Sequence, residues 1–127
     1  MSRTGLVIVS STRAAAGEYE DRSGPIAVEF LRNQGLKTPD PIVVADADIF
    51  YAVEQALRSK NAPAVLLTSG GTGISLDDLT VEAIRKHLDK EMPGIAVEFW
   101  NKGLAKLPTT ALSRCIAGVA EIGRAHV

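Results

Sequence analysis

Residues 64–73, AVLLTSGGTG, decide the fold class of this chain. Residues 64–67 form a short, continuous apolar run, which is typical of a strand that is buried on both faces of a parallel sheet. The glycines follow this strand directly, so their loop is expected at the carboxyl end of the sheet, where open α/β folds bind ligands. The stretch therefore predicts a buried strand that ends in a ligand-binding loop.

Similar short strands alternate with helical segments along the rest of the chain. Apolar runs predict strands at residues 5–9 and 42–44, and residues 13–21 are expected to form a loop. This alternation predicts one α/β domain with a mostly parallel sheet. Capping residues, breakers and apolar spacing predict the helices. They run from Ser23 to near residue 35, from Asp46 or Asp48 to near residue 59, from Thr80 to near residue 90, from Ile95 to near residue 104 and, more weakly, from Pro108 to near residue 116.

Composition limits the classes of function. The 127 residues suffice for one domain with a buried core, and 14 basic against 15 acidic residues leave a net charge of −1, without the basic excess that nucleic acid requires. No apolar run approaches the roughly 20 residues of a membrane-spanning helix. One cysteine, Cys115, and two histidines exclude an internal disulfide and a closed zinc site. We therefore expect a cytoplasmic protein without a nucleic-acid or membrane partner.

The loop after the strand at 64–67 carries three glycines in four positions, Gly70, Gly71 and Gly73, flanked by the hydroxyls of Ser69 and Thr72. Glycines let backbone N–H groups approach an anion closely, and the hydroxyls add further donors. The alternative is a tight turn that needs a positive φ, which explains one glycine. No lysine follows the last glycine, as a P-loop requires, and the G-x-G-x-x-G spacing is absent. The loop therefore predicts binding of phosphate or a similar anion.

Two carboxylates bracket this loop. Asp78 lies five residues after Gly73, and Asp48 lies at the end of the preceding strand. At the ends of adjacent parallel strands, two carboxylates hold Mg²⁺ together with the phosphates of a substrate. The alternative is that both aspartates cap helices, and the spacing alone favours neither interpretation. Asp46 and Asp77 are near-duplicates that are able to take either part.

Three weaker features favour structural roles. His87, at the end of a predicted helix, is expected on the surface. Cys115 is expected as a small apolar core residue and not as a nucleophile. The apolar cluster of Val97, Phe99 and Trp100 is expected in the core or in a subunit interface.

Five ordered blocks of sequence, which together span nearly everything from Gly5 to Val119, point to one family. The blocks are Ser11–Thr12–Arg13 with Gly17, Asp21 and Ser23–Gly24; residues 66–73; Asp78–Leu79–Thr80 with Glu82–Ala83; Glu91–Met92–Pro93–Gly94; and Leu112–Ser113–Arg114. In this order and spacing they resemble the molybdopterin-binding Mog/MoaB family.

The resemblance implies a three-layer α/β/α fold around a mixed sheet, and a homotrimer that works with other proteins of the molybdenum cofactor pathway. Catalytic members of the family adenylate molybdopterin with Mg-ATP and release pyrophosphate. By position, Asp48 and Asp78 fall on the family's two functional acids, so both are expected to be catalytic and to bind Mg²⁺. The resemblance places substrate binding on Thr12, Ser69, Gly70, Gly71, Thr72, Gly73 and Ser113.

Two other functions stay open at this point. One is a non-catalytic molybdopterin-binding or assembly module of the same fold. The other is the related domain of nicotinamide-nucleotide-recycling proteins, which has a similar Gly-rich loop. Incubation with molybdopterin and Mg-ATP, followed by a search for adenylylated pterin, separates the enzyme from both.

The chain departs from the family pattern at three places. Thr12 stands where the family often has aspartate, so any carboxylate role there is lost. Ala47 replaces a common proline before Asp48. Family members continue past the Leu–Ser–Arg block into another strand and an Asn-Leu-Pro-Gly-type loop that completes the substrate site. We therefore expect residues 1–120 to be one C-terminally incomplete domain, which would be inactive and poorly soluble when expressed alone. Residues 121–127 are expected to be a non-native tail, because a widely used sequencing adapter encodes the same heptapeptide.

Overall fold

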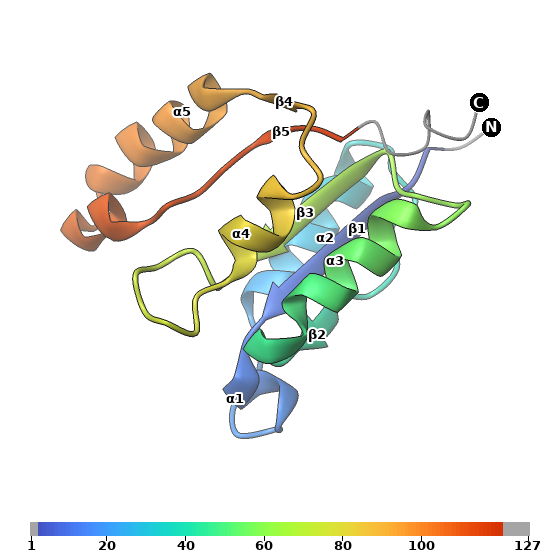
Figure 1. Cartoon of the computed structure of the whole chain (residues 1–127), viewed down its shortest axis with the longest axis horizontal. Coiled ribbons are helices and arrows are strands. Elements are labelled where there is room, and N and C mark those ends of the chain that lie inside the picture. Colours follow the sequence, from blue (N-terminus) through green and yellow to red (C-terminus); the bar gives the residue numbers. More distant parts are fainter. Residues whose placement is uncertain (1–2, 121–127) are drawn as a thin grey trace.

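The computed structural model describes residues 3–120, in which a three-stranded parallel sheet carries helices on both faces (Figure 1). The expectation about residues 121–127 lies outside the described residues. The elements, with η for 3₁₀-helices, are β1 (Gly5–Ser10), α1 (Thr12–Ala15), α2 (Ser23–Asn33), β2 (Ile42–Val44), η1 (Asp46–Asp48), α3 (Ile49–Arg58), β3 (Val65–Ser69), α4 (Thr80–Arg85), β4 (Lys90–Glu91), α5 (Pro93–Leu104), η2 (Pro108–Leu112) and β5 (Gly118–Val119).

Strand β1 is the centre of the parallel sheet, whose order is β2-β1-β3. Ile8 pairs with Ile42 on one side and with Thr68 on the other. Because β1 is flanked on both sides and covered on both faces, Val7 and Ile8 are fully buried. Strands β2 and β3 are therefore not neighbours, and the prediction that Asp48 and the Gly-rich loop follow adjacent strands is wrong.

Helices pack on both faces of the sheet, which confirms the predicted three-layer α/β/α fold. Alternate residues of β1 point to opposite faces, as the pleat of a strand requires. On one face, Val7 and Val9 contact the buried residues of α2, Val28 and Leu31. On the other face, Ile8 packs against α3 and α4 through Ile49, Val53 and Ala83. Figure 1 shows α3 in front of the sheet and α2 behind it.

The C-terminal third forms a smaller unit to one side of the sheet, beyond α4 (Figure 1). It contains α5, η2 and the antiparallel pair β4–β5. Trp100 of α5 donates its indole N–H to the carbonyl of Ser113, at 3.0 Å. Val97 and Phe99 are exposed in this chain, by 47% and 50%, so the core alternative predicted for them is wrong. None of the helices described is long and apolar enough to cross a membrane.

Several predicted element boundaries are wrong, some because of a local cap and others because of pairing with a distant strand. Residues 12–15 form α1 where a loop was expected, since the Ser11 hydroxyl accepts the N–H of Ala14 and caps the helix. Helix α4 ends at Arg85 and not near residue 90. The N–H of Asp89 donates to Val119, so pairing with β5 takes over where the helix was expected to continue. Residues 113–116 are not helical either.

Ser23 does not cap helix α2 as predicted. It is the first residue of the helix, and its hydroxyl donates to Asp21 at 3.1 Å. The carboxylate of Asp21 also accepts the N–H of Gly24, at 3.2 Å from Oδ2, so the aspartate satisfies the free N–H at this end. The predicted stop at Gly35 is confirmed by its positive φ of 87°.

His87 lies inside the protein and not on the surface as predicted. Only 8% of it is exposed, in the turn after α4. Burial lowers the pKa of the imidazole, and the nearby charges of Arg58 and Lys86 lower it further, against an opposing effect of Glu54. Cys115 is half-buried, and burial raises the pKa of its thiol. That it is not a nucleophile stays a prediction.

We expect the burial of His87 to make folding stability depend on pH. With the pKa lowered in the folded state, the unfolded chain binds more protons, so stability is complete above the ordinary histidine pKa of about 6.5 and falls as the pH drops below it. Urea unfolding at pH 7 and pH 5 measures this loss. The variant His87→Gln should show a smaller difference between the two pH values, and an equal difference would contradict the assignment.

Candidate functional site

The Gly-rich loop follows β3 at the carboxyl edge of the parallel sheet, where it was predicted. Gly70 and Gly71 both have a left-handed backbone, with φ of 83° and 71°. A Cβ on Gly70 would overlap the carbonyl oxygen of Ser10, and one on Gly71 would overlap the hydroxyl of Thr80. The turn explanation therefore accounts for two of the three glycines and not only one.

The three carbonyls that follow are held by the body of the protein. Gly71 accepts the N–H of Thr80 at 3.0 Å, and Thr72 accepts the N–H of Arg114 at 2.7 Å. Gly73 accepts the guanidinium Nε–H of Arg114 at 2.7 Å. Within residues 3–120, the N–H groups of residues 71–73 donate no hydrogen bond. Successive backbone N–H groups without a partner in the protein are suited to binding an anion.

One hydroxyl from a distant segment lies beside the loop. Ser113 lies 3.3 Å from Thr72, oxygen to oxygen, although 41 residues separate them. The Ser69 hydroxyl instead donates to Ser23 at the start of α2, at 2.9 Å. The structure thus brings Ser113 to the loop, as the family resemblance implied, while Ser69 is engaged with the first helix.

Asp78 lies against the loop and does not cap a helix. Its Oδ2 accepts the N–H of Ser75 at 2.9 Å, which closes a short turn. A Cβ added to Gly73 would lie 2.7 Å from the same oxygen, so a side chain there would force the carboxylate to shift. Leu79, and not Asp78, occupies the position before α4, without a side-chain bond to the helix. The helix-capping explanation of Asp78 is therefore wrong.

The other two acidic candidates, Asp46 and Asp48, differ in their hydrogen bonds. Asp46 accepts the Ser10 hydroxyl at 2.7 Å, and its N–H donates to the hydroxyl of Thr12 at 3.0 Å. Ser10 itself is 5% exposed and lies beneath Gly70, so Asp46 is connected to the loop through it. Asp48 is exposed and, within the described residues, forms no side-chain hydrogen bond, not even with the helix that it precedes. A functional role of Asp48 stays a prediction.

Arg114 and Glu82 were not predicted to belong to the site. The guanidinium of Arg114 contacts Gly73, the carbonyl of Asp78 at 2.9 Å and both carboxylate oxygens of Glu82. The hydrogen bond from Arg114 lowers the pKa of Glu82. Both residues lie in the blocks that resemble the family, but nothing in their local sequence indicates that they meet.

The carboxylates suit a magnesium ion that arrives with phosphates. No cluster of three or more histidine, cysteine, aspartate or glutamate side chains is placed to hold a metal between residues 3 and 120. Mg²⁺ is normally held by only one or two carboxylates plus substrate phosphates, and it takes hard oxygen donors such as Asp78. The donor set therefore fits Mg²⁺ bound as a complex with ATP.

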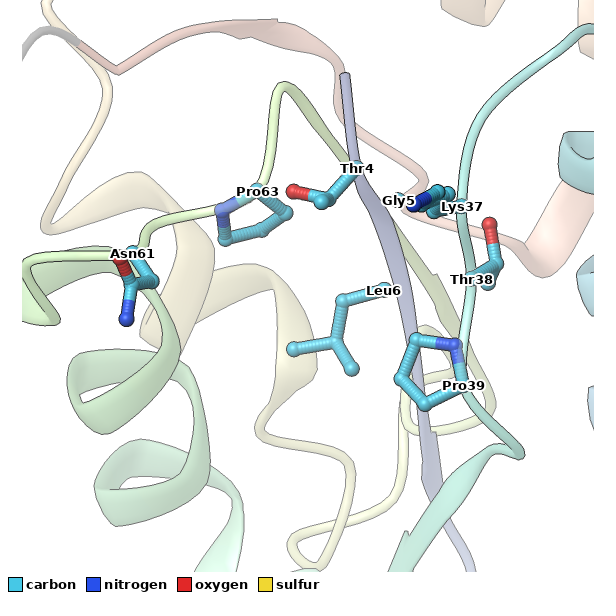
Figure 2. Close-up of a pocket in the computed structure, with 8 residues that line it drawn as sticks. All are labelled: Thr4, Gly5, Leu6, Lys37, Thr38, Pro39, Asn61 and Pro63. Carbon is cyan, nitrogen blue, oxygen red and sulfur yellow. The ribbon is translucent and has the colours of Figure 1, made fainter. Parts of the chain in front are cut away.

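A hollow lies at the opposite edge of the sheet. It has a volume of about 490 Å³ and is formed by the start of β1 and the segments before β2 and β3. Figure 2 shows Leu6 among its lining residues, of which Lys37 is the charged one. The hollow holds neither a carboxylate nor a Gly-rich loop, so the candidate chemistry lies elsewhere.

Comparison with known proteins places the chain in a family. The family model described as a probable molybdopterin binding domain matches residues 6–124. A molybdopterin adenylyltransferase of Pyrococcus furiosus is 36% identical over 115 residues, which are 89% of this chain and 66% of that protein. A molybdenum cofactor biosynthesis protein B of Halalkalibacterium halodurans is 37% identical over 124 residues, 94% of this chain and 70% of that protein. The chain thus spans about two thirds of the length of these relatives.

A solved structure agrees with the sequence comparison. The molybdopterin biosynthesis Mog protein from Mycobacterium ulcerans superposes on this chain with a TM-score of 0.85 and 40% identity. The alignment covers 97% of this chain and 79% of that one.

Proposed function

Since this chain belongs to the family of probable molybdopterin-binding domains, we propose that it adenylates molybdopterin with ATP in molybdenum cofactor biosynthesis. The row of unpaired N–H groups at residues 71–73 carries this proposal. Both substrates bear phosphates, and such a row binds an anion without needing a charged side chain. The Pyrococcus furiosus relative is a molybdopterin adenylyltransferase, and this reaction is the one proposed here.

The reaction requires mainly that the two substrates are positioned and that the negative charge of their phosphates is neutralised. A terminal phosphate oxygen of molybdopterin attacks the α-phosphorus of ATP, the bond to the β-phosphate breaks, and pyrophosphate leaves. We assign the N–H groups of the Gly-rich loop to holding a phosphate, with the hydroxyls of Thr72 and Ser113 beside it. Preorganised donors of this kind lower the barrier because they need no rearrangement when charge develops.

Asp78 is the acid that we assign to the reaction, because its carboxylate lies against the loop. Mg²⁺ bound with ATP would neutralise phosphate charge there, held by Asp78 and by Asp48 as the family pattern implies. Asp46 is the alternative to Asp48, since it is joined to the loop through Ser10.

The oligomeric state, the compartment and the partner proteins are also proposals. We propose a homotrimer in the cytoplasm that exchanges pterin with other proteins of the molybdenum cofactor pathway. The exposed apolar side chains of α5, among them Ile95 and Phe99, offer surface for contact between subunits. The absence of a disulfide partner for Cys115 suits a reducing compartment.

A turnover assay on the complete product of the gene tests the function. The protein is incubated with molybdopterin and Mg-ATP, and pyrophosphate and adenylylated pterin are measured together. We expect equal amounts of both products, and neither when molybdopterin is omitted. Binding of molybdopterin without either product would support the non-catalytic binding module instead.

A further inference from the structure

We propose that Arg114 is the positioning residue of the Gly-rich loop and that it acts by fixing Asp78 beside the row of free N–H groups. Its Nε–H donates to the carbonyl of Gly73 at 2.7 Å, and Nη2 donates to the carbonyl of Asp78 at 2.9 Å. The two acceptors lie at the two ends of the segment 73–78. One rigid guanidinium thus closes this segment into a loop of defined width.

Glu82 fixes the guanidinium in turn. Its two carboxylate oxygens accept from Nη1 and Nη2 of Arg114, in a two-pronged pair. Glu82 lies in α4, which packs on the sheet through Ala83, so the pair anchors the loop to the core. The backbone N–H of Arg114 also holds Thr72 at 2.7 Å. Arg114 therefore connects the loop, the acid and the helix behind them.

The pair is poorly suited to a role in stability alone. The side chains of Arg114 and Glu82 are 37% and 44% exposed. Ion pairs with this much exposure add little to the free energy of folding because water screens them. What the arrangement supplies is geometry: the Arg114 side chain holds the carbonyl of residue 73, next to N–H groups that have no partner within residues 3–120.

The test compares Arg114→Lys with a matched control, Arg85→Lys, which lies on α4 in the exposed ion pair with Glu91. Lysine keeps the charge but does not reproduce three directed donors. We expect Arg114→Lys to lower kcat by about 10–100-fold, the usual effect of removing a group that orients an active residue. The KM for ATP should change by less than about threefold, and Arg85→Lys should leave both constants unchanged.

A double variant shows whether Arg114 acts through Asp78. In the Asp78→Asn background, Arg114→Lys should cause no further loss of kcat, because the group that it positions is already inactive. A loss of kcat in the double variant equal to the product of the losses in the two single variants would overturn the proposal.

This kinetic test rests on the proposed function. A second measurement tests the role of Arg114 without requiring any enzymatic activity. The N–H groups of Ser75 and Asp78 are hydrogen-bonded within this loop, at 2.9 Å to Asp78 and 3.0 Å to Ser75. In the protein without substrates, their amide hydrogen exchange should be at least about tenfold faster in Arg114→Lys than in wild type or Arg85→Lys. Unchanged exchange would overturn the inference. If wild type fails to turn over, the proposed function fails, and the exchange result alone decides the role of Arg114.

Discussion

Replacing Asp78 with asparagine is expected to lower adenylyl transfer by at least about 100-fold while the protein stays folded, which is the order of loss when one preorganised electrostatic group is removed. Asparagine has nearly the same shape and accepts the same hydrogen bond from the N–H of Ser75. It lacks the negative charge that holds Mg²⁺ with the phosphates of ATP. Steady-state kinetics and the thermal midpoint are measured on the same preparation.

Asp77→Asn is the matched control for this experiment. Asp77 is the exposed neighbour in the same turn, and its N–H lies 3.4 Å from the hydroxyl of Ser75. The control removes one carboxylate from the residue next to Asp78. If turnover depended only on the net negative charge of this turn, both variants would lose the same activity. Turnover near the wild-type level in Asp78→Asn would remove Asp78 from the mechanism. Equal losses in both variants would show that its position against the loop is irrelevant.

Gly70→Ala is expected to destabilise the fold by more than about 3 kcal/mol, with urea unfolding as the measurement. The residue has a φ of 83°, which costs alanine about 1–2 kcal/mol by itself. In addition, the new Cβ would overlap the backbone carbonyl of Ser10 in the central strand, which has no room to move.

Gly35→Ala isolates the cost of the backbone conformation. Gly35 has nearly the same φ, 87°, but a Cβ there meets nothing within 4 Å. We expect this control to cost only the conformational part, about 1–2 kcal/mol. Similar losses in the two variants would mean that the loop is able to move away from β1, and that its close packing does not determine its shape.

The sequence alone predicts those parts of the fold that depend on local periodicity. The apolar run before Ser10 and the spacing of Ile49 and Val53 predict β1 and α3 correctly, because burial of one face selects such patterns. The end of α4 and the order of the strands depend on partners far along the chain. No local pattern indicates that Asp89 pairs with Val119, or that β1 separates β2 from β3.

The candidate site is predictable to the same degree. Three glycines with flanking hydroxyls indicate an anion-binding loop, and the N–H groups of residues 71–73 have no partner within residues 3–120, which is compatible with that prediction. Arg114 holds the carbonyl of Gly73 from 41 residues away, and local sequence carries no sign of that contact. His87 was misplaced for the same reason, since its burial depends on packing and not on its position in the helix.

The fate of the phosphorus atoms of ATP tests the central claim most directly. The complete gene product is incubated with molybdopterin, Mg²⁺ and ATP that is labelled either at the α- or at the γ-phosphorus, and the pterin product is isolated. If the molybdopterin phosphate attacks the α-phosphorus, the α-label appears in the pterin and the γ-label in pyrophosphate. Transfer of the γ-label to the pterin, or a pterin that binds but stays unlabelled with both forms of ATP, would contradict the account.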